Sequence, residues 1–203
     1  MIRTIVFDMG GVLIQFDREY FIRRLNVDPA DEQALMNEVF YSLEWARMDR
    51  GSLTEAEAVK SICTRLPERL HLAAERLVTM WERPILEVDG MYDLVKELKD
   101  RGYKVYLLSN ASVRQHEYWP RIPAAELFDG KLISSDVRLV KPQPEIYRLF
   151  CDTFQVLPEE CFFIDDSPQN IEGAYEVGIQ GAIFHGEVGA LRESLRAAGV
   201  PVG

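Results

Sequence analysis

The chain has 203 residues, a formal net charge of −10 at pH 7 and a pI near 4.9. This charge disfavours a general binder of nucleic acid or anionic membranes, since those partners attract clustered Lys and Arg. A small anionic substrate is still compatible with it, provided that a cation is built into the site. The length suits one domain with a substantial insertion.

The cysteines and the N-terminal segment predict the cellular compartment. Cys63, Cys151 and Cys161 are odd in number and widely spaced, which favours buried, reduced thiols over disulfides or zinc ligands. The first residues read as a strand rather than a secretory signal, and no apolar run reaches membrane-spanning length. We therefore expect a cytoplasmic protein without a membrane or nucleic-acid partner, and the sequence does not indicate its oligomeric state.

Short apolar runs alternate with helical segments along most of the chain. This pattern is typical of an α/β fold with a parallel sheet covered on both faces, a Rossmann-like doubly wound core. The predicted strands are Ile2–Phe7, Lys104–Leu108, Gly130–Ser134, Cys161–Ile164 and Gly181–Phe184. The predicted helices between the last four are Gly90–Arg101, Pro144–Phe154 and Pro168–Val177, the last with Ser167 as its cap.

The first interval, from Phe7 to Lys104, is far too long for an ordinary crossover. Helical periodicity recurs within it at Asp17–Leu25, Asp31–Phe40, Thr54–Leu66 and Leu70–Glu82, and Thr54 with Glu57 forms a capping-box pattern. We therefore expect a helical cap at 15–88, inserted into a core made of 1–14 and 89–203. The junctions Gln15–Asp17 and Glu87–Gly90 are the natural hinges. The cap is expected above the carboxyl ends of the strands, where open α/β sheets bind ligands.

Polar residues follow three predicted strands, and a lysine precedes a helix. They are Asp8, Ser109, Asn110, Asp165, Asp166 and Lys141. Each alone is also typical of a turn, a helix cap or a solvated lysine. Together, each at the same end of its strand, they predict one site at the sheet edge.

The residue types at this edge favour phosphoryl transfer. Neighbouring carboxylates repel one another, so a buried group of them implies a cation, and oxygen ligands favour Mg²⁺. Lys141, the Ser109 hydroxyl and the backbone amides of Met9 and Gly10 are then placed to bind a dianion. A carboxylate nucleophile, a bridging metal and donors for the phosphoryl oxygens make up such a site.

The same residues lie in four motifs, FDMGGVL, LLSN, KPQPEIY and FIDDSPQNIEGAYEVG, in that order. The chain thereby resembles the haloacid dehalogenase-like hydrolase superfamily over nearly its whole length, and the insertion is similar to the family's helical cap. The sequences of these motifs are most similar to those of small bacterial phosphatases of the glucose-1-phosphate phosphatase type, which also have glycine two positions after the nucleophile.

The resemblance implies a role for each position. Asp8 would attack phosphorus and form an aspartyl phosphate, and Gly10 would offer its backbone carbonyl to Mg²⁺. Ser109 and Asn110 would hold phosphoryl oxygens, while Lys141 would neutralise charge and orient Asp8.

The same resemblance places the remaining metal ligands in the acidic motif FIDDSPQN. Asp166 takes the metal-ligand position, and Asp165 is expected as a second ligand, direct or through water. Asn170 is expected to orient a water on the metal. These roles imply a magnesium-dependent phosphatase that acts on a small phosphorylated metabolite, such as a sugar phosphate.

Gly10 stands where the family usually has the aspartate that protonates the leaving oxygen. Three readings follow: a phosphatase whose proton comes from elsewhere or whose substrate needs none, a 2-haloacid dehalogenase, or a non-enzymatic family member. The complete remaining set favours the first, because a dehalogenase needs no metal and a binding module needs no nucleophile. Asp17 and His116 are the candidate proton carriers.

Two segments are candidates for substrate recognition. Trp45, Arg47, Asp49 and Arg50 in EWARMDRGSLT precede a predicted turn at Gly51, and Arg47 or Arg50 is expected to contact the substrate beyond its phosphate. In HEYWP, Tyr118 and Trp119 either line the pocket or pack beneath the cap.

Overall fold

The computed structural model describes all residues from 1 to 203. Its core is a sheet of five parallel strands in the order β3-β2-β1-β4-β5. The strands are β1 (Thr4–Phe7), β2 (Lys104–Ser109), β3 (Gly130–Ile133), β4 (Cys161–Asp165) and β5 (Gln180–Ile183). The predicted fold class is confirmed, and every strand lies within two residues of its predicted ends.

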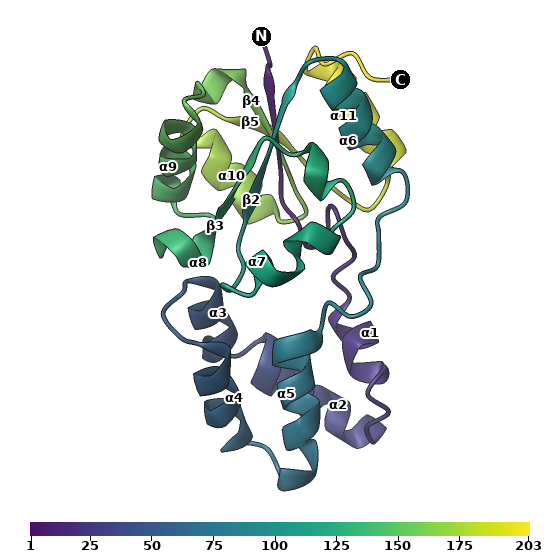
Figure 1. The fold of residues 1–203 in the computed structure, drawn as a ribbon, viewed down its shortest axis with the longest axis vertical. Helices are drawn as coiled ribbons and strands as arrows, with labels where there is room; N and C mark the ends of the chain where they lie inside the picture. Colours follow the sequence, from purple (N-terminus) through teal and green to yellow (C-terminus); the bar gives the residue numbers. More distant parts are fainter.

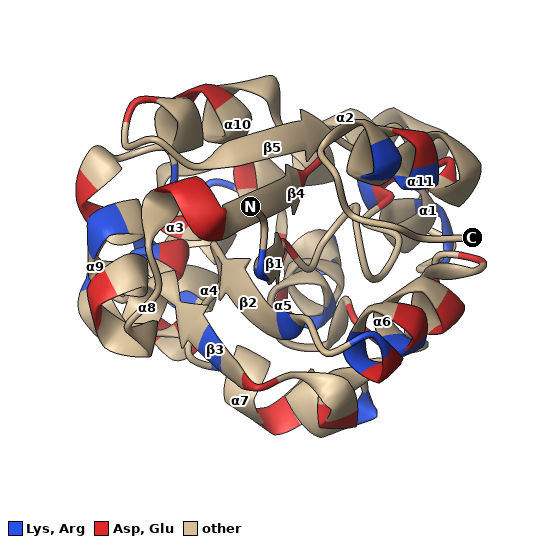
Figure 2. Ribbon diagram, turned by 90° about the horizontal axis from the view of Figure 1, so that it is seen from above, with Lys and Arg blue, Asp and Glu red and all other residues tan.

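Helices cover both faces of the sheet (Figure 2). One face carries α6 (Met91–Asp100) and α11 (Val188–Ala197), and the other carries α9 (Pro144–Phe154) and α10 (Pro168–Tyr175). Strand β1 shows why both faces are buried, since Ile5 and Phe7 join the first apolar cluster while Val6 joins the second. A strand that is buried on both sides reads as a continuous apolar run, which is what the sequence shows.

A second group of helices lies below the carboxyl ends of the strands, and both chain termini lie at the opposite end of the molecule (Figure 1). We call this group the cap. It contains α1 (Arg18–Arg23), α2 (Pro29–Leu35), the π-helical segment Met36–Phe40, α3 (Leu43–Asp49), α4 (Glu55–Cys63) and α5 (His71–Met80). These helices share an apolar cluster of their own. The limits 15–88 for a separate cap unit stay a prediction.

Local signals explain most of these helix ends. Thr54 and Glu57 form the predicted capping box at the start of α4. Ser167 precedes α10 as predicted, but its hydroxyl makes no capping bond; instead the Ser167 N–H donates to Asp165 Oδ1 at 2.8 Å. Helix α3 was not predicted, although Ser42 caps it by accepting from the Trp45 N–H.

The two connections between cap and core lie side by side. Residues Ile14 and Glu87 form an antiparallel bridge, and the Gln15 N–H donates to the Leu86 carbonyl at 2.8 Å. Close by, the buried Glu82 carboxylate pairs with Arg114 Nη2 at 2.7 Å and with Arg121 Nη2 at 3.0 Å. Glu82 follows α5, whereas both arginines belong to the core, so this ion cluster fastens the cap to the core.

Cys63, Cys151 and Cys161 are free thiols, of which Cys151 and Cys161 are buried. None of the helices combines the length and the apolar character needed to cross a membrane.

Candidate active site

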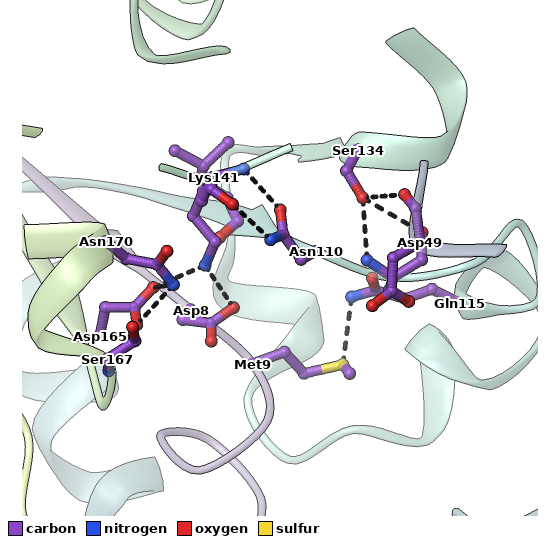
Figure 3. A network of polar contacts seen from close by, with 12 residues as sticks. Asp8, Met9, Asp49, Asn110, Gln115, Ser134, Lys141, Asp165, Ser167 and Asn170 are labelled. Carbon is purple, nitrogen blue, oxygen red and sulfur yellow. Dashed lines mark hydrogen bonds and ion pairs between the residues drawn. The ribbon is translucent and has the colours of Figure 1, made fainter. Parts of the chain in front are cut away.

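The strand register brings the predicted site residues to one edge of the sheet. Phe7 is aligned with Leu107 on β2 and with Ile164 on β4, so the next residues, Asp8 and Asp165, emerge at the same level. Lys141, from the loop before α9, reaches between them (Figure 3). Its Nζ lies 2.8 Å from Asp8 Oδ1 and 2.6 Å from Asp165 Oδ2.

Lys141 is buried and held at three points. Its ammonium donates to the Leu108 carbonyl at 2.9 Å, while its backbone N–H and carbonyl bond the side chain of Asn110 at 2.8 and 3.0 Å. Burial disfavours the charge on Lys141, but Asp165 and then Asp8 outweigh it and raise the lysine pKa. Lys141 is therefore a fixed positive charge beside Asp8.

Asp8 ionises less readily than an ordinary aspartate. Burial raises its pKa to about 7, and Lys141 only partly offsets that effect. Two further carboxylates add to the effect of burial, because Asp165 and Asp166 each bring an oxygen to within 4.8 Å of the Asp8 oxygens. Three carboxylates near a single lysine leave excess negative charge, which a divalent cation with oxygen preference would balance.

The consecutive residues Asp165 and Asp166 have different surroundings, as expected at a strand end. Asp165 is fully buried and accepts from Lys141, from Asn170 Nδ2 at 3.0 Å and from the Ser167 N–H. Asp166 is exposed to the pocket and accepts no hydrogen bond from another side chain. Asp166 therefore has oxygens to offer to a metal, whereas those of Asp165 are already in use.

The loop after β1 presents unused backbone groups to the same space. The N–H groups of Met9 and Gly10 make no hydrogen bond in the structure, nor does the Gly10 carbonyl accept one. Ser109, at the end of β2, is buried, and Asn110 after it likewise has a free backbone N–H. These donors and the free carbonyl suit an anion and a cation respectively.

Gly11 makes the close approach of this loop to β4 feasible. Its φ is +81°, and a Cβ at this position would lie 2.2 Å from Asp166 Oδ2. Gly10 is different, because a Cβ there would meet only Phe16, at 3.5 Å. A side chain at position 10 is therefore not excluded by the space around its Cβ.

The site opens into a pocket of about 240 Å³ between core and cap. The cap side contributes Phe16, Arg18, Trp45, Met48, Asp49, Val78 and Trp81. Arg47 and Arg50, which we expected to contact the substrate, are exposed and do not line it. The cation on this wall is Arg18, whose guanidinium lies 4.9 Å from the centre of the Phe16 ring. Tyr118 lines the pocket, whereas Trp119 packs against Phe128 in the core.

The two predicted proton carriers lie elsewhere. Asp17 caps α1 by accepting from the Tyr20 N–H at 2.9 Å, and His116 Nε2 lies 3.0 Å from the Asp136 carboxylate. Neither lines the pocket. The acidic cap residue that lines the pocket is Asp49. The sequence offered no indication of this beyond the place of Asp49 before the Gly51 turn.

A family model for haloacid dehalogenase-like hydrolases matches residues 2–178. The chain belongs to this family. The predicted resemblance is thus confirmed for the superfamily, and the likeness to the glucose-1-phosphate phosphatase type stays a prediction.

Known members of the haloacid dehalogenase-like hydrolases resemble the chain over nearly its whole length. It is 29% identical to a D-ribitol-5-phosphate phosphatase from Bacteroides thetaiotaomicron, with 94% of each chain covered. It is 24% identical to a phosphorylated carbohydrates phosphatase from Thermotoga maritima, over 87% of this chain and 82% of that one.

Solved structures of this family share the fold. A hydrolase from Porphyromonas gingivalis superposes with a TM-score of 0.73 at 25% identity, covering 97% of this chain and 98% of the other. A magnesium complex of a family enzyme from B. thetaiotaomicron gives a TM-score of 0.70 at 25% identity, covering 90% and 93%.

Proposed function

We propose that the protein is a magnesium-dependent phosphatase that hydrolyses a small phosphomonoester through an aspartyl-phosphate intermediate on Asp8. The observation that carries the proposal is the placement of Asp8, which is paired with a buried lysine, flanked by two carboxylates and open to the pocket. Similarity to two phosphatases of phosphorylated polyols and carbohydrates supports it.

The chemistry of the donor set fits Mg²⁺. Asp8, Asp166 and the Gly10 carbonyl would hold the ion directly, and Asp165 would complete the site or orient its ligands. When bound, the metal supplies positive charge that draws the phosphoryl group toward Asp8 and stabilises the transition state. Asn170, which donates to both oxygens of Asp165, would keep that carboxylate in place.

The remaining residues would bind the phosphoryl group and aim the nucleophile. Lys141 neutralises charge and holds Asp8 Oδ1, leaving the other carboxylate oxygen for attack on phosphorus. The free N–H groups of Met9 and Gly10, with the Ser109 hydroxyl, would donate to phosphoryl oxygens. Asn110 would act through its backbone N–H, because its side chain is bonded to Lys141.

The pocket supports a phosphorylated polyol or sugar as substrate. Its volume of about 240 Å³ lies below the roughly 300–1,000 Å³ that is usual for drug-sized ligands. Trp45, Trp81 and Tyr118 offer aromatic faces, and Arg18 offers donors for hydroxyl groups. We expect Arg18→Ala to raise KM for a polyol phosphate more than for p-nitrophenyl phosphate, with Arg50→Ala as the matched control outside the pocket.

The test is phosphate release from p-nitrophenyl phosphate and a panel of sugar and polyol phosphates, with Mg²⁺ or with EDTA. We expect activity that needs Mg²⁺ and is abolished by Asp8→Asn, but is retained by Asp17→Asn, which removes an exposed carboxylate and keeps a good helix cap. Release that persists in Asp8→Asn would exclude Asp8 as the nucleophile. A folded protein that is inactive on the whole panel would favour a non-enzymatic role.

A further inference from the structure

The proposed reaction lacks a proton donor for the leaving oxygen, because Gly10 carries no side chain. We infer that Asp49, on the last turn of cap helix α3, is the general acid and base of the reaction. This inference rests on the phosphatase function proposed above. It assigns to a cap residue the proton transfer that a core carboxylate at position 10 would otherwise perform.

The placement of Asp49 is the first support. It lines the same pocket as Asp8 and Asp166, opposite the strand ends. In the view of Figure 3, Asp8 lies between the Asp165–Asn170 pair and Asp49. In that view Asp165 thus lies on one side of the nucleophile and Asp49, a residue of the cap, on the other. The side-chain oxygens of Asp49 have no hydrogen-bond partner within the protein, so its carboxyl group, when protonated, is free to donate one.

The backbone of Asp49 is anchored to the core, so its position is fixed relative to Asp8. Ser134 Oγ donates to the Asp49 carbonyl and accepts from the Ala111 N–H at 3.0 Å. Ala111 directly follows Asn110, the residue that holds Lys141. Two residues after Asp49, Gly51 packs so closely on the core that a Cβ there would lie 2.2 Å from the Ser135 carbonyl oxygen. A single bridge through Ser134 therefore connects the proposed acid to the loop that bears the phosphate-binding groups.

The surroundings of Asp49 favour its protonated form near neutral pH. Burial is the largest effect, the negative charge of Asp8 acts in the same direction, and Lys141 and Arg18 oppose them; together they raise the pKa of Asp49 to about 8. Tyr118 also faces this carboxylate, and its own pKa is raised, first by burial. A carboxyl group that is neutral at pH 7 can donate a proton in the first step and accept one in the second.

The reaction proceeds in two steps. Asp8 attacks phosphorus, the bond from phosphorus to the leaving oxygen breaks, and that oxygen takes the proton of Asp49 to leave as an alcohol. Asp49, now a carboxylate, removes a proton from water as the water oxygen attacks phosphorus. The bond to Asp8 breaks, its electrons return to the Asp8 carboxylate, and inorganic phosphate leaves with Asp49 protonated again.

The experiment compares two leaving groups in Asp49→Asn. An alkoxide needs a proton to leave, whereas p-nitrophenolate is a stable anion. For ribitol 5-phosphate, or another alkyl phosphate that the wild type hydrolyses, we expect kcat/KM to fall by about 10²- to 10⁴-fold. For p-nitrophenyl phosphate we expect the first step to survive and the second to slow. The variant should then release a burst of one equivalent of nitrophenolate and accumulate the phosphoenzyme.

Two further measurements separate a catalytic role from a structural one. In the wild type, kcat/KM for the alkyl phosphate should fall as the pH rises through the raised pKa of Asp49, whereas kcat/KM for p-nitrophenyl phosphate should not fall there. Adding Gly10→Asp to Asp49→Asn should restore part of the alkyl phosphatase activity, because the space beside Gly10 admits a Cβ. Asp17→Asn is the control that leaves both substrates unaffected.

The failures of the two proposals are distinguishable. If the wild type releases no phosphate from any substrate, or if Asp8→Asn stays active, the phosphatase proposal fails and the role of Asp49 fails with it. If the wild type is an Asp8-dependent phosphatase, three results overturn the role of Asp49 alone. They are an equal loss of kcat/KM for both leaving groups, no loss of kcat/KM for either, and a wild type that hydrolyses p-nitrophenyl phosphate but no alkyl phosphate.

Discussion

Asn110 and Lys141 hold each other through two hydrogen bonds that run in opposite directions. Asn110 Nδ2 donates to the Lys141 carbonyl oxygen at 3.0 Å, and the Lys141 N–H donates to Asn110 Oδ1 at 2.8 Å. The residue after β2 thus fixes the backbone from which the buried lysine reaches Asp8. This pairing gives the Asn110 side chain a positioning role and leaves only its backbone N–H to face a phosphoryl group.

Removing the Asn110 side chain should therefore act through Lys141. We expect Asn110→Ala to lower kcat by about 10- to 100-fold and the free energy of unfolding by about 1–3 kcal/mol, since two backbone groups of Lys141 lose their partners. Steady-state kinetics and urea unfolding measure both effects. Asn37→Ala, on the exposed surface of the cap, should leave both unchanged. An unfolding free energy equal to that of the wild type would contradict the positioning role.

Gly11→Ala should weaken the binding of Mg²⁺. The new methyl group would collide with Asp166 Oδ2 and would push this oxygen away from the proposed metal site. We expect the Kd for Mg²⁺ to rise at least tenfold in isothermal titration. Gly102→Ala is the matched control, because Gly102 also has a positive φ but no atom lies within 4 Å of its added Cβ. An unchanged Kd in Gly11→Ala would remove Asp166 from the ligand set.

The metal-free protein should lose stability as the pH rises. Burial raises the pKa of Asp8 to about 7 and that of Asp49 to about 8, from an ordinary value near 4, so the folded protein binds protons that the unfolded chain has released. Each group therefore destabilises the fold increasingly from about pH 4 up to its folded pKa, and the effect then levels off. Urea unfolding in EDTA at pH 5 and pH 8 measures this slope. Asp8→Asn and Asp49→Asn should each reduce it, and a slope that neither variant alters would be inconsistent with the raised pKa values.

Glu82→Gln should destabilise the junction of cap and core. The buried carboxylate is shared by Arg114 and Arg121 and also pairs with Arg83 Nε, and neutralising it removes the negative charge that these guanidiniums face. We expect a loss of roughly 1–3 kcal/mol, because the carboxylate is buried but the Arg121 side chain is 43% exposed and water stabilises its charge. Glu117→Gln is the control, since Glu117 is exposed and lies 3.8 Å from the same Arg114. Equal melting temperatures for Glu82→Gln and the wild type would show that the cluster adds no stability.

The strands and three of the core helices, α6, α9 and α10, could be predicted from the sequence because their signals are local, whereas core helix α11 was not predicted. Helix α9 begins at Pro144 and ends at Phe154 as predicted, since a proline at the first turn and the apolar spacing define it. Helix α3 was missed because it has only seven residues and little periodicity. The Ser42 cap was its one readable signal.

The part of the candidate site that follows from strand positions could be predicted from the sequence, and the part that depends on contacts between distant segments could not. Asp8, Lys141, Asp165 and Asp166 converge because parallel strands end at the same edge, a rule that needs only strand positions. The position of Asp49 depends on the contact between α3 and α8 (Ser134–Val137), which are far apart in the chain. No local pattern predicts such a contact, and the same holds for the presence of Arg18 in the pocket in place of Arg47 and Arg50.

The paired connections at Ile14 and Glu87 have a mechanical consequence. Two separate connections would let the cap shift, twist and tilt independently of the core. The two segments here are hydrogen-bonded side by side, so together they resist shear and bend most easily about one axis. Once the contacts of Asp49 and Gly51 with Ser134 and Ser135 are broken, the distance from Asp49 to Asp8 would follow a single opening angle. One pair of spectroscopic labels, across the cap and the core, would be enough to follow the catalytic distance through a turnover.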